Sequence, residues 1–499
     1  MKSVFKSKEK RDAASSHIEF IPNEATSDDY DTDHSFHHAC NELITWTPEE
    51  EKKVVFKIDC YLLITIFWMY LLSYMDRTNV GNAYAAGMKD DLKMDSSQYS
   101  IALVVFFVFY VIFEIPASYL LIKIGPKLFL PTIMLLWGVI SCCYSAVQNN
   151  GQVVALRCLV GLFEAGFAPG ILLILSSWYK KAEQSKRFAA YISAAILSGA
   201  FGGIIAGLIT EYLEDAKGIA GWRWLFIIEG SGTIFISLIA FFTLLPLPQH
   251  MKPGKRFSER EIQIALERLR KDNVVNDDGD NVSAWQAIWL NCKSLRVLLL
   301  IVGYMVIVGS STLSYFYPTL NEGLGYTGFM IQYMTIPIYG SAFVLNLFVS
   351  FFSDRFIQWR GLYLTILLLA AGIFSIVVVT HHEYKTRYAM LCLMASALWA
   401  ANALALSYAA TTLSDKDSKT RSVGLSLINA IGNLAQIYGS YLFPSKDSPK
   451  YTMGFGVITG MCFLGGITYG LLAVINYLKI KKQKSTSFQE TASEPDIVK

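Results

Sequence analysis

The segment RCLVGLFEAGFAPG, residues 157–170, lies inside an apolar run from about Val153 to Ser176. This run is long enough to cross a lipid bilayer as a helix, yet it carries Arg157 and Glu164. Charged side chains at membrane depth are costly and usually face a protein interior or a water-filled path. Their spacing places both charges on one helix face, about 10 Å apart along the axis. Either they form an internal charge pair that only holds helices together, or they belong to a site for a substrate and a proton.

The composition places the whole chain in a membrane. Its 499 residues are 53% hydrophobic and only 17% charged, whereas a soluble protein of this length needs more surface charge. The eight cysteines show no CxxC spacing, and most lie in apolar runs, so we expect packing residues and not disulfides or metal ligands. The sequence contains no metal-ligand spacing, phosphate loop or nucleophile elbow. We therefore expect no metal, no cofactor, no nucleic-acid partner and no enzymatic activity.

Twelve apolar runs follow a polar N-terminal tail that we expect to be disordered. They predict an all-α membrane protein with twelve transmembrane helices in two six-helix halves. The central loop between the halves contains a predicted short amphipathic helix that starts at the capping box Ser258–Glu261. The runs have approximate limits 58–87, 98–122, 128–147, 152–177, 188–211, 223–247, 297–319, 327–353, 361–380, 387–412, 422–443 and 452–478. The predicted parts are a tail (1–56), a first bundle (57–247), the central loop (248–296), a second bundle (297–478) and a tail (479–499).

The distribution of Lys and Arg over the loops predicts the orientation. Basic residues in short loops mark the cytosolic side of a membrane protein. The loops after runs 2, 4, 8 and 10, the central loop and the C-terminal tail hold most of them. We therefore expect both termini in the cytosol.

The first run is too short to cross on its apolar part alone. Cys60 to Met75 would span about 24 Å, less than the roughly 30 Å of hydrocarbon. A crossing helix must then carry Asp76 and Arg77 into the membrane. The alternative is a helix that ends at Asp76, with both charges at the interface.

Two further glutamates lie inside predicted helices. Glu114 precedes Pro116, which kinks a helix and frees a backbone carbonyl, and it is either a proton site or a structural partner for a basic residue. Glu229 lies near the start of the sixth run, and we interpret it first as a packing or gate residue. The second-half runs carry mainly neutral polar groups, so their amides either orient a ligand or bond helix to helix.

Several motifs resemble those of known families. Two six-helix halves joined by a cytosolic loop resemble the major facilitator layout, and SFFSDRFIQWRG at 350–361 is similar to the gate motif of that superfamily, matched by Asp354 and Arg355. The first-half copy, SYLLIKIGPK, has Ile122 where the acid belongs. Five segments resemble the anion:cation symporter family, and within it the fungal allantoate permease group: DRTNVGNA (76–83), RCLVGLFEAGFAPG (157–170), SWYKKAEQSKR (177–187), GWRWLFIIEG (221–230) and GNLAQIYGSYLFP (432–444).

This resemblance implies a secondary transporter that imports a small organic carboxylate with protons. Nicotinate is the favoured substrate, and pantothenate, allantoate and biotin are alternatives. Arg77, Arg157 and Glu164 match positions that line the route in related vesicular carriers. We expect the arginines to hold the carboxylate and Glu164, with Asp76 and Glu114, to serve proton coupling. Protonated Glu164 would release Arg157, while Asp76 would hold Arg77 in the empty site. Further expected substrate contacts are Tyr315, Tyr317, Asn402 and Asn433.

A nutrient sensor without net transport is the alternative from another class. The tails are short for a signalling protein, which favours a carrier. The partners we expect are the carboxylate, protons and the lipid bilayer. We expect a monomer in the plasma membrane, with the endoplasmic reticulum or the vacuole as alternative locations.

Overall fold

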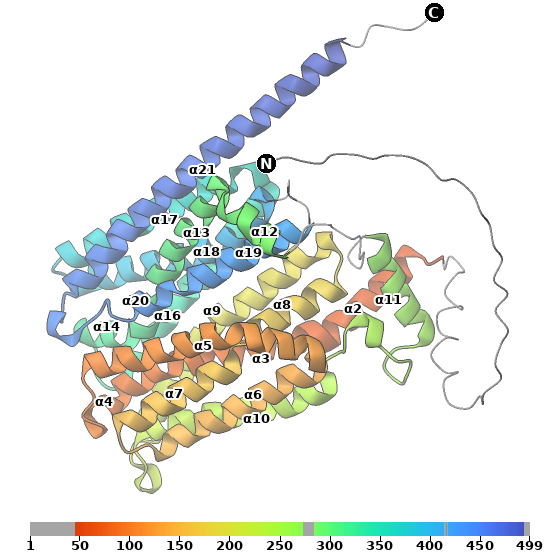
Figure 1. The fold of residues 1–499 in the computed structure, drawn as a ribbon. Helices are drawn as coiled ribbons and strands as arrows, with labels where there is room; N and C mark the ends of the chain where they lie inside the picture. The colour runs from red at the N-terminus through yellow and green to blue at the C-terminus, as the bar shows by residue number, and fades with distance from the viewer. Residues whose placement is uncertain (1–44, 273–283, 414–415, 417, 494–499) are drawn as a thin grey trace, which may run out of the picture. The chain divides into compact units, whose positions relative to one another are not determined.

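The computed structural model describes residues 45–272, 284–413, 416 and 418–493 (Figure 1). The chain forms two units, Met1–Trp46 and Thr47–Lys499, and the fold described here is that of the second. All regular structure in the described residues is helical. Most of the predicted N-terminal tail and part of the predicted central loop lie outside the described residues.

The first half begins with one nearly continuous helical segment. It runs from Pro48 to Asp91, so the chain stays helical through Asp76 and Arg77. The fourth crossing is divided at Ala165–Gly166 into two helices, α7 and α8. The elements of this half are α2 (Pro48–Ile58), η1 (Asp59–Leu63), α3 (Ile64–Ala83), η2 (Tyr84–Met88), α4 (Lys89–Asp91), α5 (Ser96–Ile124), α6 (Pro126–Cys143), η3 (Tyr144–Ala146), α7 (Asn150–Glu164), α8 (Phe167–Trp178), α9 (Lys181–Tyr212), η4 (Ala216–Gly218) and α10 (Gly221–Thr243).

The second half repeats this plan after the loop helix α11 (Glu259–Lys271). Eleven segments of the described chain have the length and hydropathy to cross a membrane. The predicted run 422–443 supplies the twelfth crossing as two shorter helices, because its amide-rich middle interrupts the apolar sequence. The elements are α12 (Ala284–Cys292), α13 (Leu295–Ser311), η6 (Thr312–Phe316), α14 (Tyr317–Gly323), α15 (Met330–Tyr333), α16 (Thr335–Arg355), η7 (Ile357–Trp359), α17 (Arg360–Thr380), α18 (Tyr384–Thr412), α19 (Ser418–Asn433), α20 (Ala435–Gly439), η8 (Ser445–Asp447) and α21 (Thr452–Ser493).

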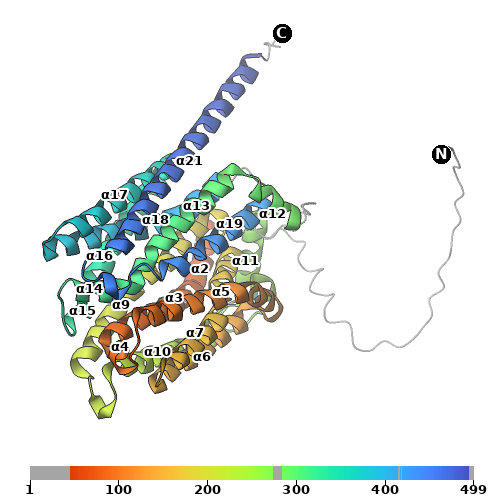
Figure 2. The ribbon, with the colours of Figure 1, turned by 60° about the vertical axis from the view of Figure 1, so that its left-hand side comes forward.

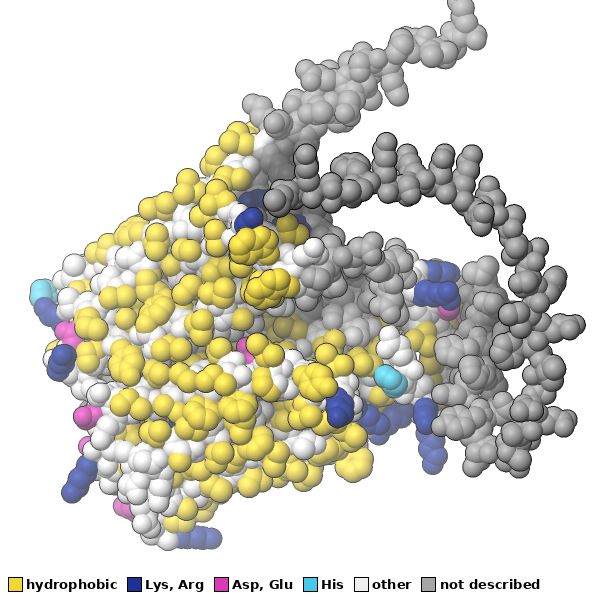
Figure 3. Space-filling view, in the orientation of Figure 1, with side chains coloured by type: hydrophobic (Ala, Val, Ile, Leu, Met, Phe, Trp, Pro, Cys, Tyr) yellow, Lys and Arg dark blue, Asp and Glu magenta, His cyan; other side chains and the backbone are white. Residues whose placement is uncertain are grey.

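The crossings pack side by side and show apolar side chains outward. Helices α17 and α21 pack along each other, as Figure 2 shows, and α10 packs on α6 and α3. The space-filling view has hydrophobic side chains over most of the described surface that it displays, with charged ones mainly toward its two ends (Figure 3). Such a surface belongs in a bilayer, where apolar side chains contact lipid.

The two halves meet through polar contacts near one end of the crossings. We call the end that carries α11 the α11 face, and the end that carries η4 the opposite face. Lys89 pairs with Glu322 at 2.7 Å, and the Gln332 side chain donates to the carbonyl of Asn82 at 3.1 Å. The Tyr99 hydroxyl donates to the Tyr315 carbonyl at 2.9 Å. These bonds join the halves toward the opposite face.

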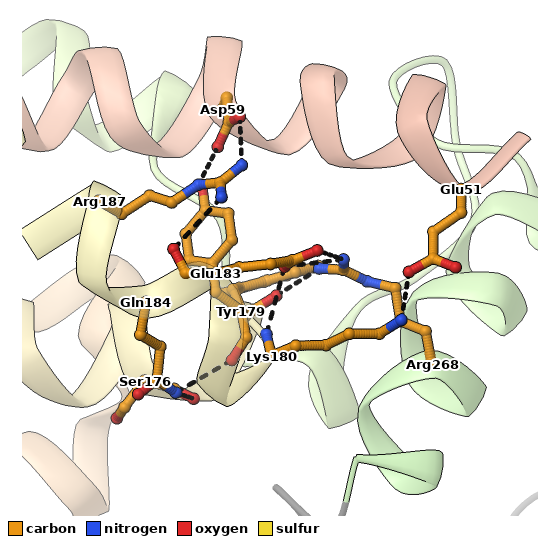
Figure 4. Close-up of polar contacts among 10 residues, drawn as sticks. Glu51, Asp59, Ser176, Tyr179, Lys180, Glu183, Gln184, Arg187 and Arg268 are labelled. Atoms are coloured by element: carbon orange, nitrogen blue, oxygen red, sulfur yellow. Dashed lines mark hydrogen bonds and ion pairs between the residues drawn. The ribbon is translucent and has the colours of Figure 1, made fainter. Parts of the chain in front are cut away.

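At the α11 face, ion pairs hold α2 and α11 against the start of α9 (Figure 4). Arg268 of α11 is fully buried. Its guanidinium donates to both carboxylate oxygens of Glu183 at 3.2 and 3.1 Å and to the Trp178 carbonyl at 2.6 Å. Two further pairs tie α2 and η1 to the same region: Glu51 with Lys180, and Asp59 with Arg187.

A more exposed pair joins α2 and α11. Lys57 lies 2.9 Å from Glu261, which also completes the Ser258 capping box. Partial burial acts to raise the pKa of Glu261, but the hydrogen bonds from Lys57 and Ser258 outweigh it, and the pKa is lowered. A carboxylate with a lowered pKa stabilises the fold above its unfolded-state pKa, and this contribution is lost as the pH falls through the folded-state value.

Arg268→Ala is expected to lower the stability by about 3 kcal/mol, because it leaves the Glu183 carboxylate and the Trp178 carbonyl without their buried donor. The melting temperature of the purified protein measures the effect. Arg270→Ala is the matched control: the Arg270 side chain is 71% exposed and lies 3.5 Å from Glu267, so its loss should cost less than about 0.5 kcal/mol. Equal melting temperatures for the two variants would show that α11 is not held by Arg268.

Candidate functional site

Helix α3 carries both of its charged residues into the interior of the first half. It continues to Ala83, and Asp76 and Arg77 lie well before its end. Asp76 is buried, and the Arg77 side chain is only 12% exposed. The prediction that the helix carries both charges inward is therefore confirmed, and the alternative helix that ends at Asp76 is wrong.

Glu164, the last residue of α7, lies at the centre of the site. It is fully buried, and its Oε1 accepts hydrogen bonds from the Arg77 Nε at 2.6 Å and from the Ser73 hydroxyl at 2.5 Å. Ser73 was not among the predicted site residues. Its position four residues before Arg77 places both on one face of α3, and this spacing could have indicated it.

Arg157 is buried close to this ion pair but outside it. Its Nη2 donates to the Arg77 carbonyl at 3.4 Å, and no carboxylate pairs with it among the described residues. The expectation that Glu164 holds Arg157 is thus corrected, because seven residues of helix separate the two groups by about 10 Å along the axis. Both guanidinium groups lie over one ring, with the Cζ atoms of Arg77 and Arg157 at 5.6 and 5.5 Å from the Phe106 centroid.

A glycine allows this close approach of α5 and α7. A Cβ on Gly161 would lie 2.5 Å from the Phe106 carbonyl oxygen, so only a residue without a side chain fits there. Gly161 shares its helix face with Arg157 and Glu164. Residues 157–170 therefore supply the two charges and also the space for the facing helix.

Asp76 faces away from Arg77. Its Oδ2 accepts hydrogen bonds from the Trp137 indole at 3.1 Å and from the Thr233 hydroxyl at 2.9 Å. The expectation that Asp76 holds Arg77 is corrected as well. Successive residues of a helix point about 100° apart, so these neighbours reach different helices.

A small hollow lies beside the two arginines. Tyr315 borders it, and its hydroxyl donates to the Gln436 side chain at 3.2 Å. Gln436 in turn donates to Asn433 at 3.2 Å, so Asn433 reaches the hollow only through Gln436. Gln436 was not a predicted site residue, although it lies in the amide-rich segment. The residues that line the hollow are Arg77, Leu103, Phe106, Phe107, Arg157 and Tyr315.

The other predicted site residues do not line this hollow. Tyr317 is buried, and its ring centroid lies 5.3 Å from that of Tyr339. Asn402 is half-buried on α18, and Glu114 is half-buried on α5, one turn beyond Tyr110. In the predicted gate motif, Arg355 is exposed at the end of α16, and the side chain of Asp354 lies outside the described residues.

Several charged atoms of the site lack a hydrogen-bond partner among the described residues. They are Nη2 of Arg77, Nε of Arg157 and Oε2 of Glu164, all buried. Buried polar atoms are almost always satisfied by protein or water. Two guanidinium groups with unused donors bind an anion well, and a carboxylate with an unused oxygen can accept a proton.

The helical architecture and this buried charged site define a membrane transporter, and the comparisons identify its family. The model of the Major Facilitator Superfamily matches residues 66–440. The MFS transporter prlL of Fungal sp. (strain NRRL 50135) is 35% identical over 83% of this chain and 84% of its own. The chain belongs to the Major Facilitator Superfamily and is an integral membrane transporter, not an enzyme.

Other relatives agree with this assignment. The MFS-type transporter cnsO of Penicillium expansum is 30% identical over 87% of this chain and 84% of its own. The high-affinity nicotinic acid transporter of Saccharomyces cerevisiae is 28% identical over 82% of this chain and 74% of its own. The crystal structure of a bacterial homolog to the human lysosomal transporter Spinster has a TM-score of 0.59 at 14% identity, covering 86% of this chain and 95% of that chain. This likeness shows the fold.

Proposed function

We propose that this protein imports a small organic carboxylate together with protons, as a member of the allantoate permease group of anion:cation symporters. The Arg77–Glu164 ion pair beside the unpaired Arg157 is the observation that carries the proposal. Nicotinate is the favoured substrate, and pantothenate, allantoate and biotin are the alternatives. The yeast relative named as a nicotinic acid transporter supports this choice.

The geometry suggests how the proton and the anion are coupled. Arg157 binds the carboxylate first, because no protein carboxylate competes for it. A proton on Glu164 then weakens its bond to Arg77, and Arg77 becomes the second donor to the substrate. Loss of the substrate restores the ion pair and favours release of the proton. Each proton is thereby linked to one bound anion.

The hollow is too narrow in the described state to hold a water molecule, so a substrate enters only when its walls move apart, and these walls favour a flat ring. Phe106, Phe107 and Tyr315 border the space beside the guanidinium groups. Aromatic rings pack edge-to-face or offset against one another. An acid such as nicotinate presents a carboxylate to the arginines and a ring to these side chains.

The orientation follows from the basic loops. We place the α11 face and both termini in the cytosol and the protein, as a monomer, in the plasma membrane. The contacts that join the halves then lie on the outer side, so the described state is closed toward the outside. Asp354 and Arg355 would act as a gate on the cytosolic side.

Uptake of labelled nicotinate in cells without their own carrier tests the proposal. We expect uptake that is stimulated at acidic external pH, abolished by a protonophore and reduced at least a hundredfold in Arg157→Ala, since a lost charged hydrogen-bond pair costs about 3 kcal/mol. An absence of uptake from a correctly located protein would exclude nicotinate and lead to a panel of other small carboxylates. If none of these is transported, a sensor becomes the better hypothesis.

A further inference from the structure

Glu229 of α10 is a buried acid that the proposed coupling does not use. Its side chain is only 2% exposed, and neither carboxyl oxygen has a hydrogen-bond partner among the described residues. An ionised carboxylate in such surroundings costs far more than a neutral one. Glu229 is therefore best accommodated in this state with a proton bound.

The acid next to Glu229 is Asp76. Thr233 lies one turn beyond Glu229 on α10, hence on the same face, and its hydroxyl donates to Asp76 at 2.9 Å. Two neighbouring carboxyl groups favour a state in which one of them keeps a proton.

The other helices packed against α10 bring no basic side chain to this point among the contacts that we describe. From α6, Cys142 lies beside Gly230, where a Cβ would be 2.7 Å from its Sγ. From η3, Tyr144 stacks on Phe226 with a centroid distance of 4.6 Å. Three titratable residues of α9 and η2 turn elsewhere: Tyr191 packs against the Tyr70 ring, Tyr84 stacks on Tyr99, and Glu211 accepts a hydrogen bond from Tyr333.

Asp76 connects this region to the transport site. It directly precedes Arg77, whose Nε pairs with Glu164 at 2.6 Å, although Asp76 itself bonds to neither Glu164 nor Arg157. Both regions contain buried polar atoms without a partner among the described residues: the Tyr144 hydroxyl, both Glu229 oxygens, Arg157 Nε and Glu164 Oε2. Such atoms are commonly satisfied by internal water, which can conduct protons between carboxyl groups.

We propose that Glu229 is a second proton-carrying residue of the transport cycle. The Glu229 carboxylic acid gives its proton to the Asp76 carboxylate, directly or through water, and the Glu229 carboxylate takes up a new proton from the opposite face. Glu229 lies near the opposite face, because α10 begins there at Gly221 and Glu229 is about 12 Å further along the helix. The proposal rests on the proton coupling proposed above: the proton that Asp76 receives passes on to Glu164, and Glu229 is the side chain that supplies it.

Infrared spectroscopy of the reconstituted full-length protein, without substrate, tests this directly. We expect a carbonyl band of a protonated carboxylic acid whose intensity changes between acidic and neutral pH, and which E229Q removes. E229D keeps the carboxyl group and should shift the band, which assigns it even if E229Q folds poorly. E259Q is the control: Glu259 is exposed at the start of α11, so its replacement should leave the band unchanged. A band of constant intensity, or one that E229Q leaves in place, overturns the proposal.

D76N and transport assays separate a proton carrier from a packing residue. With the neighbouring charge removed, the Glu229 band should titrate at a different pH in D76N, whereas an acid that keeps its proton throughout would show the same constant band in both proteins. In E229Q, acid stimulation of uptake should fall about a hundredfold, the lower end of the range for loss of a positioned proton-transfer group, while substrate exchange persists. Wild-type acid stimulation in E229Q overturns the proposal. The infrared titration contains no substrate, so its outcome does not depend on whether nicotinate is transported.

Discussion

Glu164→Gln is expected to abolish accumulation of the substrate above its external concentration while substrate exchange continues. Glutamine has nearly the same shape and can still accept hydrogen bonds from Ser73 and Arg77, but it cannot take up or release a proton. Proteoliposomes with an imposed pH gradient measure accumulation, and counterflow of labelled substrate measures exchange. The accumulation ratio should fall to one, the value for a carrier without coupling.

Ser73→Ala is the matched control for this experiment. It removes one hydrogen bond to the same Glu164 oxygen and leaves the titratable group in place. Accumulation should persist, with an apparent affinity altered by about 1 kcal/mol, or roughly fivefold. Wild-type accumulation in Glu164→Gln would instead assign the coupling to another acid.

The sequence predicted which charges enter the membrane more reliably than it predicted their partners. Hydropathy and span length placed Asp76 and Arg77 inside α3, since a shorter helix cannot cross. Helical spacing also placed Arg157 and Glu164 on one face. The Arg77–Glu164 pair, however, joins residues 87 positions apart, and no local pattern specifies such a contact.

The second half was harder to predict for a related reason. Its helices are apolar on nearly every side, so the period that marks an inward face in a soluble helix is weak. Tyr317 and Asn402 were chosen by residue type and do not line the hollow, whereas Tyr315 does. Gln436, which bonds to Tyr315, follows Asn433 by three residues and so lies near it on the helical path.

Gly207→Leu is expected to abolish transport by preventing the two halves from closing at the opposite face. Gly199, Gly203 and Gly207 lie four residues apart on one face of α9, where small residues allow close helix approach. A Cβ on Gly207 would lie 2.1 Å from the Tyr333 ring of α15, and one on Gly203 would lie 2.2 Å from Thr335 of α16. If the added side chain destabilises the closed state by about 3 kcal/mol through overpacking, the population of that state falls roughly a hundredfold.

A second substitution shows whether closure itself is the cause. Tyr333→Ala removes the ring that meets the new leucine, so Gly207→Leu/Tyr333→Ala should recover uptake, although it also loses the Tyr333 hydrogen bond to Glu211. Gly460→Leu is the control, because nothing lies within 4 Å of a Cβ at that position of α21. Initial uptake rates, normalised to the amount of folded protein, measure all three. If the double variant stays inactive while Gly460→Leu is active, the glycines serve the folding of α9 and not its contact with the second half. Recovery would instead mean that transport requires the contact between α9 and α15 to form and to open. Alternating access demands a state that is sealed on each side of the membrane in turn.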